Sequence, residues 1–204
     1  QQFTGILVDL LSPVGLTLAI EIDSGASTID QITNNGQINV LGLGSITAWE
    51  FSINGGESWS PGTGSSFLVA EGTYPSGQIQ VRDSNVTSTN ASLEGQLVVD
   101  LTSPVSPLLT IDAQGVAVVE NLESNSVLQF SVDAGLTFVD AASGTFIVPD
   151  GEYLAGDIQA RQIDIAGNVS EATKYIAFTL DTTPPTPPVI NNVAGDNIIN
   201  LGES

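Results

Sequence analysis

The sequence contains no cysteine, no histidine and no methionine, and only three of its 204 residues are lysine or arginine. Without cysteine and histidine there is no disulfide scaffold, no zinc finger and none of the common haem ligands. Ser-His-Asp and Cys-His catalysis are excluded for the same reason. Binding to nucleic acid or to an anionic membrane surface is not expected, because both depend on lysine and arginine.

The chain is rich in acidic and apolar residues. Its 23 aspartates and glutamates give a net charge of −20, yet only 13% of the residues are charged and 41% are hydrophobic. That balance is typical of a globular protein rather than a disordered acidic tail. No apolar run approaches the roughly 18 residues of a membrane-spanning helix, so membrane insertion is not expected. Because the chain begins at Gln1 without a signal-like segment, we expect a mature chain or a fragment.

The chain repeats itself internally. Residues 51–82 align with residues 130–161 at a constant offset of 79, without a gap and with 11 identities. Aromatic residues recur at matching positions in the two segments. Arg82 and Arg161, two of the three cations, occupy the same repeat position. Chance agreement is improbable in a chain with so few aromatic and basic residues, so the sequence indicates a duplicated unit.

Short motifs that each follow an apolar run mark the joints between units. They are residues 9–13 (DLLSP), 100–104 (DLTSP) and 181–185 (DTTPP). Their spacing is that of whole domains and not of solenoid turns. We therefore expect four parts: the end of a preceding unit or an N-terminal strand (1–9), a first sandwich (10–100), a second sandwich (101–181), and a proline-rich linker with the start of a third unit (182–204).

Within each unit, short segments alternate between apolar and polar residues and are separated by turn residues. Residues 49–53 and 78–82 alternate in this way, and residues 54–56 (NGG) provide a hairpin signal between them. About seven short strands per unit predict an all-β fold built from tandem antiparallel β-sandwiches of the immunoglobulin-like kind. The expected core aromatics are Phe51, Phe67, Tyr74, Phe130, Phe146 and Tyr153.

Three segments resemble a known repeat family. Residues 51–59 (FSINGGESW) resemble the hairpin of bacterial immunoglobulin-like repeats, as do residues 151–170 (GEYLAGDIQARQIDIAGNVS), and residues 181–185 (DTTPP) resemble the joint between such repeats. These tandem repeats occur in very large calcium-dependent surface and biofilm adhesins exported by type I secretion. The resemblance covers both units. It implies an extracellular location on a bacterial surface and a role in cell adhesion.

Calcium is the cofactor that this resemblance implies, held between neighbouring units. Ca²⁺ prefers carboxylate and carbonyl oxygens. Carried over by position, its ligands would come from Asp100 and Asp181, with Asp164 contributing from the loop at 164–168 (DIAGN). Unit one lacks such a loop, so its joint with unit two is expected to be the weaker site. The full set of metal candidates is Asp9, Asp23, Asp30, Asp100, Asp164, Asp181 and Asp196. The alternative is that these acids only keep the chain soluble.

The arginines and tryptophans are expected to have structural roles, and no catalytic group is expected. Arg82 and Arg161 are expected to pair with a neighbouring acid or carbonyl, because a position shared by both units suits a common scaffold. Trp49 and Trp59 are expected to pack into the sandwich rather than to form a sugar-binding platform, because they align with apolar residues. No pair of carboxylates has the apolar surroundings of a catalytic cleft, and neither a Gly-x-Ser-x-Gly elbow nor a phosphate-binding loop is present. An enzymatic role is therefore not expected.

The expected function is that of a structural extender, which projects a ligand-binding region away from the cell. Neighbouring repeats of the same chain would be its partners, and Ca²⁺ at the joints would stiffen the array. One alternative is a carbohydrate- or protein-binding module. Another is a filament subunit that self-associates by strand exchange, in which one copy lends a strand to the next.

Overall fold

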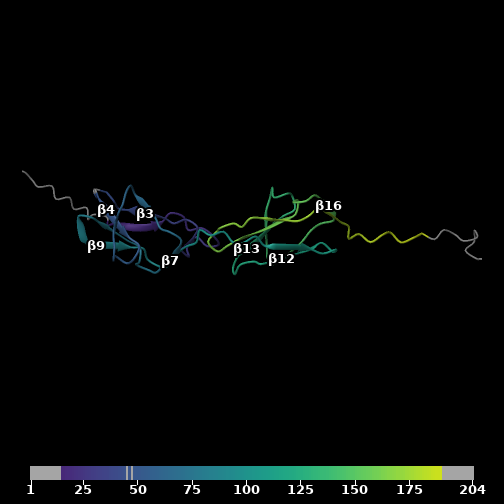
Figure 1. Cartoon of the computed structure of the whole chain (residues 1–204), viewed down its shortest axis with the longest axis horizontal. Helices are drawn as coiled ribbons and strands as arrows, with labels where there is room; N and C mark the ends of the chain where they lie inside the picture. Colours follow the sequence, from purple (N-terminus) through teal and green to yellow (C-terminus); the bar gives the residue numbers. More distant parts are fainter. Residues whose placement is uncertain (1–14, 45, 47, 190–204) are drawn as a thin grey trace, which may run out of the picture.

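The computed structural model describes residues 15–189 except 45 and 47, and the chain is all-β throughout that part (Figure 1). Strands of the first half pair only with one another, as do strands of the second half. Unit one contains β1 (Thr17–Ile20), β2 (Ile32–Thr33), β3 (Gln37–Leu41), β4 (Trp49–Ser52), β5 (Ser60–Pro61), β6 (Ser66–Leu68), β7 (Gly72–Tyr74), β8 (Gln80–Asp83), β9 (Val86–Ser92) and β10 (Leu97–Val99).

Unit two repeats this plan without a counterpart of β2. Its strands are β11 (Leu108–Ile111), β12 (Val116–Glu120), β13 (Val127–Ser131), β14 (Val139–Ala141), β15 (Thr145–Ile147), β16 (Gly151–Tyr153), β17 (Gln159–Ile163), β18 (Thr173–Lys174) and β19 (Phe178–Leu180). Both units exceed the expected seven strands, with ten strands in unit one and nine in unit two, and many of these strands have only two or three residues.

Matching sheets form the two sandwiches. In unit one the sheets have the orders β1-β3-β6, β5-β4-β8-β9 and β2-β10-β7, and in unit two the orders β11-β12-β15, β14-β13-β17-β18 and β16-β19. All pairs are antiparallel except β2 with β10, which run parallel. These pairings establish two immunoglobulin-like β-sandwiches, as the internal repeat predicts. No helix in the described part of the chain is long and apolar enough to cross a membrane.

Each unit has its own hydrophobic core. Alternate residues of β3 and of β12 are buried, which is the pattern of a strand with one face inward. Phe51 stacks on Phe67 with ring centroids 4.2 Å apart, and Phe130 stacks on Phe146 at 4.1 Å, as predicted for the core. Burial of such apolar side chains stabilises each unit by about 1.5–3 kcal/mol per residue. Because the two cores share no residue, each sandwich has an independent source of stability.

The turn that follows β4 and β13 is conserved between the units in geometry but not in charge. In unit one the Asn54 side-chain oxygen accepts a hydrogen bond from the Ser58 N–H at 3.0 Å, and in unit two Asp133 accepts from the Thr137 N–H at 2.9 Å. Hydrogen bonds from the Ser131 hydroxyl and from Thr137 lower the pKa of Asp133 to about 2.

The backbone of this turn is left-handed in both units. Gly55 has φ of 73°, and Ala134, at the aligned position, has φ of 61°. An added Cβ at Gly55 would meet nothing within 4 Å. An alanine is thus already accommodated at this turn in unit two, and unit one has room for one.

Two connections differ between the units. Unit one passes from β1 to β3 through residues 21–36, which include β2, whereas unit two passes from β11 to β12 by a tight turn at residues 112–115. Conversely, Asp83 pairs with Val86 across a short β8–β9 hairpin, whereas unit two has the longer loop 164–168 at the corresponding place. Each unit therefore carries one extension that the other lacks.

The units lie end to end along the long axis of the molecule, and residues 181–189 leave unit two at the end away from unit one (Figure 1). These nine residues are all exposed and form no strand. The strand expected in 1–9 and the start of a third unit after residue 189 lie outside the described residues.

Candidate functional site

The two extensions meet at the joint between the units. Loop 164–168 of unit two contacts residues 24–26 of unit one, so we name these two segments the plug and the socket. The Ser24 hydroxyl lies 2.7 Å from the carbonyl oxygen of Ala166, and the Ala26 N–H donates to the carbonyl of Ile165 at 3.4 Å. The joint is thus made by direct contacts between residues about 140 positions apart in sequence.

Two glycines allow the close approach of the two backbones. Gly25 and Gly167 have φ of 90° and 94°, in the left-handed region that favours glycine. A Cβ on Gly25 would lie 2.0 Å from the carbonyl oxygen of Ile165, and a Cβ on Gly167 would lie 2.9 Å from the Gly25 nitrogen. Any side chain at either position would therefore separate plug from socket.

A buried carboxylate stands at the centre of the plug. Asp164 is only 6% exposed, and its two oxygens accept from the backbone N–H of Asn168 at 2.8 Å and from its side-chain amide at 2.9 Å. The same Asn168 Nδ2 also donates to the backbone carbonyl of Asp100, the first joint residue after β10, at 2.8 Å. Asn168 therefore ties the plug to the point where the chain leaves unit one.

The chemistry of these groups fits a hard cation. The Asp164 carboxylate and the Asp100 carbonyl are both oxygens of the kind that Ca²⁺ takes, and in this structure both accept from the Asn168 side-chain NH2 group, which a bound cation would have to displace. Over residues 15–189, less the two undescribed positions, no three acidic side chains gather into a metal-binding group. An ion at this joint would therefore need carbonyl and amide oxygens in addition to Asp164.

This placement differs from the expected ranking of the joints. From the sequence, the joint between units one and two is expected to be the weaker metal site, because unit one lacks the Ala-Gly-Asn loop. The structure shows that it is the loop of unit two, not that of unit one, which faces this joint. Asp164 therefore lies with Asp100, while Asp181 lies beyond β19, where unit two ends.

The remaining metal candidates lie apart from the plug. The Asp23 carboxylate accepts from the Gln31 N–H within the connection 21–36, and Asp30 accepts from the Ile32 N–H at an exposed position. Asp181 is exposed and accepts from the Thr183 N–H. Asp9 and Asp196 lie outside the described residues. All seven aspartates stay predictions as calcium ligands.

Hydrogen bonds also hold the strand that leaves each unit. Thr102, after β10, donates to Glu71 at 3.0 Å, and Thr182, after β19, donates to Asp150 at 2.8 Å. The hydrogen bonds from the Thr182 side chain, which is the main cause, and from Thr183 lower the pKa of Asp150. The acid that receives the exiting strand is therefore a repeated feature of the scaffold.

The arginines serve the scaffold, as predicted. Arg82 donates to Glu50 through Nε at 2.9 Å and Nη2 at 2.8 Å, and its guanidinium carbon lies 3.9 Å above the Trp59 ring. The corresponding positions in unit two are those of Arg161, Gln129 and Phe138. Trp49 is buried and Trp59 is half-buried beneath Arg82, so both tryptophans pack as expected.

Sequence reasoning missed Ser24 and the two glycines of the joint. The available signal was the difference in length between residues 21–36 and 112–115, which marks an insertion in unit one at the end that faces unit two. The insertion suggests a specialised end, but its partner is far away in sequence and no local pattern identifies it.

No family model matches the chain, and no curated protein matches it. A solved structure of the fibronectin(III)-like modules of Clostridium thermocellum CbhA is similar to this chain at a TM-score of 0.47 and 12% identity, covering 81% of this chain and 93% of that one. The class assigned here, a tandem pair of immunoglobulin-like β-sandwiches with a direct joint, rests on the strand pairing and the contacts described above.

Proposed function

We propose that this chain is a stretch of extender repeats from a large bacterial cell-surface adhesin, which holds a ligand-binding region away from the cell. The direct joint between plug and socket is the observation that carries this proposal. A spacer must transmit length without folding back, and close backbone contact at Gly25 and Gly167 opposes bending at that joint. The arginines and tryptophans, which would otherwise be available for recognition, are engaged within the sandwiches.

Calcium belongs to this proposal as the ion that stiffens the joint. Asp164 and Asp100 would hold it through a carboxylate and a carbonyl oxygen that lie in one small region, and the Asn168 side chain, which now donates its NH2 group to both, would turn to offer its amide oxygen instead. The ion would supply positive charge between two units of a chain whose net charge is −20. The resemblance to calcium-dependent adhesin repeats supports the same assignment and an extracellular location.

The proposal is tested by measuring the flexibility of the joint. The chain has no cysteine, so single cysteines introduced at Ser60 and Val139 provide two unique labelling sites, one in each unit. Both positions are exposed and lie on the matching edge strands β5 and β14. Pulsed electron paramagnetic resonance between two spin labels then gives the distribution of distances between the units, in EDTA and in millimolar Ca²⁺.

If the chain is a spacer, the distances between the two labels should form a single narrow distribution. Calcium that acts at the joint should narrow it further, and Mg²⁺ at the same concentration should not. The variant Asp164→Asn should remove the calcium effect, whereas Glu57→Gln, which changes an exposed acid of unit one that is not a metal candidate, should leave it intact. A broad distribution in saturating Ca²⁺ would contradict the spacer role. A narrow distribution that is the same in EDTA and in Ca²⁺ would support the spacer role and contradict the role of calcium at the joint.

A further inference from the structure

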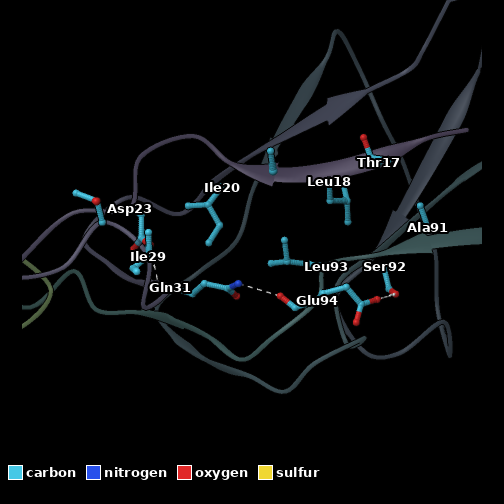
Figure 2. Close-up of a pocket in the computed structure, with 12 residues that line it drawn as sticks. Thr17, Leu18, Ile20, Asp23, Ile29, Gln31, Ala91, Ser92, Leu93 and Glu94 are labelled. Carbon is cyan, nitrogen blue, oxygen red and sulfur yellow. Dashed lines mark hydrogen bonds between the residues drawn. The ribbon is translucent and has the colours of Figure 1, made fainter. Parts of the chain in front are cut away.

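A pocket of about 520 Å³ lies in unit one between β1 and the end of β9 (Figure 2). Leu18 and Ile20 of β1 line one side, and Leu93 lines the other. Such a volume falls within the roughly 300–1,000 Å³ typical of small-ligand sites. The pocket belongs to neither the joint nor the arginine sites, so the spacer role leaves it unexplained.

Two side-chain oxygens at the polar end of this pocket accept no hydrogen bond. Asp23 Oδ2 accepts from the Gln31 N–H, but Asp23 Oδ1 is buried and accepts nothing. The Gln31 side-chain nitrogen donates to the carbonyl of Glu94 at 2.9 Å, and its oxygen is also buried without a partner. A buried acceptor without a donor is unfavourable, and unit one has two of them on residues that line one pocket.

The backbone at this end is strained. Gln31 has φ of 60°, in the left-handed region that residues other than glycine seldom adopt. Strained positions of this kind cluster at ligand clamps, where the surrounding structure holds them in place. Here the strained residue is the one that places a side chain at the wall of the pocket (Figure 2).

The corresponding place in unit two is partly filled by an aromatic ring. Leu93 and Tyr175 are equivalent, because their N–H groups donate at 2.9 Å to the carbonyls of the aligned residues Ile79 and Ile158. The Tyr175 hydroxyl reaches across to the carbonyl of Ile111 at 3.4 Å. The hollow there is smaller, about 380 Å³. Among the described residues of unit two, no buried side-chain oxygen lacks a partner. Among the described residues, the larger hollow and the two unpartnered oxygens thus occur together in unit one.

Charge defines what the pocket accepts. Asp23 and Glu94 supply carboxylates to its lining, and residues 15–100 contain a single cation, Arg82, which is paired with Glu50. The occupant must therefore bring its own positive charge, and it must bring donors for the two unpartnered oxygens. The aliphatic walls formed by Leu18 and Leu93 fit an unbranched stem.

We propose that this pocket binds a lysine or arginine side chain presented by a partner protein. The stem packs between β1 and Leu93, and the ammonium or guanidinium group donates to Asp23 and Gln31. Because neither unpartnered oxygen is exposed to solvent, binding turns these two side chains toward the pocket. The proposal does not depend on the spacer role, and it gives unit one an attachment point that unit two lacks.

The experiment is a titration of the isotopically labelled full chain, followed by nuclear magnetic resonance in EDTA. The probes are the methylamides of Nα-acetyl-lysine and Nα-acetyl-arginine. The methylamide of Nα-acetyl-norleucine is the control, since it has an aliphatic stem without a charge. We expect saturable shifts of the Ile20, Gln31 and Glu94 amide signals at millimolar concentrations of the cationic probes, and none with norleucine.

Two variants and one matched control locate the site. Leu93→Tyr introduces the side chain found in unit two and should abolish binding. Asp23→Asn preserves shape, so it keeps the test valid should Leu93→Tyr not fold, and it should weaken binding at least tenfold. Asp112→Asn removes an exposed acid at the same end of unit two and should change nothing.

Three results would overturn the proposal. The first is equal shifts with the norleucine probe, which would show a merely apolar hollow. The second is shifts that persist unchanged in Asp23→Asn. The third is a response of the same amides to Ca²⁺ alone with none to either cationic probe, which would identify a metal site instead.

Discussion

Replacing Gly25 by alanine should open the joint while leaving both sandwiches folded. The added Cβ would lie 2.0 Å from the Ile165 carbonyl oxygen, so the two segments must separate by at least 1.0 Å to reach the 3.0 Å that real contacts respect. Such a shift breaks the hydrogen bonds of Ser24 with Ala166 and of Asn168 with Asp100, which measure 2.7 and 2.8 Å.

The magnitude follows from those two bonds. Each contributes about 1 kcal/mol net, so the closed joint loses about 2 kcal/mol relative to the open one. Since every 1.4 kcal/mol is tenfold, the ratio of open to closed molecules should rise about 30-fold. The distance distribution between labels at positions 60 and 139 should broaden accordingly. Unfolding of unit one, followed by the fluorescence of Trp49 and Trp59, should shift no more than in a control with the same backbone strain.

Gly55→Ala provides that control. Gly55 has a similar left-handed conformation but no neighbour within 4 Å, and its counterpart in unit two is already alanine. It should leave the distance distribution as narrow as in the parent chain. If Gly25→Ala gave the same narrow distribution as Gly55→Ala, the joint would not be held by the contacts described, and the reasoning would fail.

Three further outcomes are expected. Arg82→Ala removes a partly buried ion pair with Glu50 and the stacking on Trp59, so the free energy of unfolding of unit one should fall by about 1–2 kcal/mol. Urea unfolding followed by tryptophan fluorescence measures this change, and an unchanged midpoint would contradict it. The hydrogen bonds that lower the pKa of Asp133 stabilise unit two. This stabilisation is fully present above the unfolded pKa of about 4 and is lost as the pH falls toward 2. Asp133→Asn, which copies Asn54 of unit one, should flatten that dependence in circular dichroism melts between pH 2 and 5, and an unaltered profile would refute it. Calcium at 100 times its Kd should add about 2.7 kcal/mol per site to stability, seen as a higher melting temperature absent with Mg²⁺; identical melts in EDTA and Ca²⁺ would reject a bound ion.

Much of the fold could be predicted because its determinants are local. The alternation of apolar residues at 49–53 and 78–82 predicted the strands observed as β4 and β8, and the 79-residue offset placed Phe51 and Phe130 at matching core positions. The structural role of Arg82 also followed from its recurrence at Arg161. Each of these inferences needs only the spacing of residues along the chain.

The joint and the pocket could not be predicted, because they depend on which way neighbouring residues face. Asp23 and Ser24 are adjacent, yet the Asp23 carboxylate lines the pocket while the Ser24 hydroxyl meets Ala166 of the other unit. Composition marks both only as polar loop residues. Likewise Leu93 and Tyr175 are both apolar strand-end residues by sequence, and only their surroundings show that one fills a space that the other leaves open.

The complementarity of plug and socket also limits how such a gene could grow. Unit two has a plug but, in place of a socket, the tight turn at 112–115, and unit one has a socket but, in place of a plug, a short hairpin at Asp83–Val86. If unit two alone were duplicated, the plug of the second copy would meet the tight turn of the first copy, which cannot bind it. If unit one alone were duplicated, the socket of the first copy would meet a unit without a plug. Recombination that preserves this joint must therefore copy the two units together, so the inherited module is the pair.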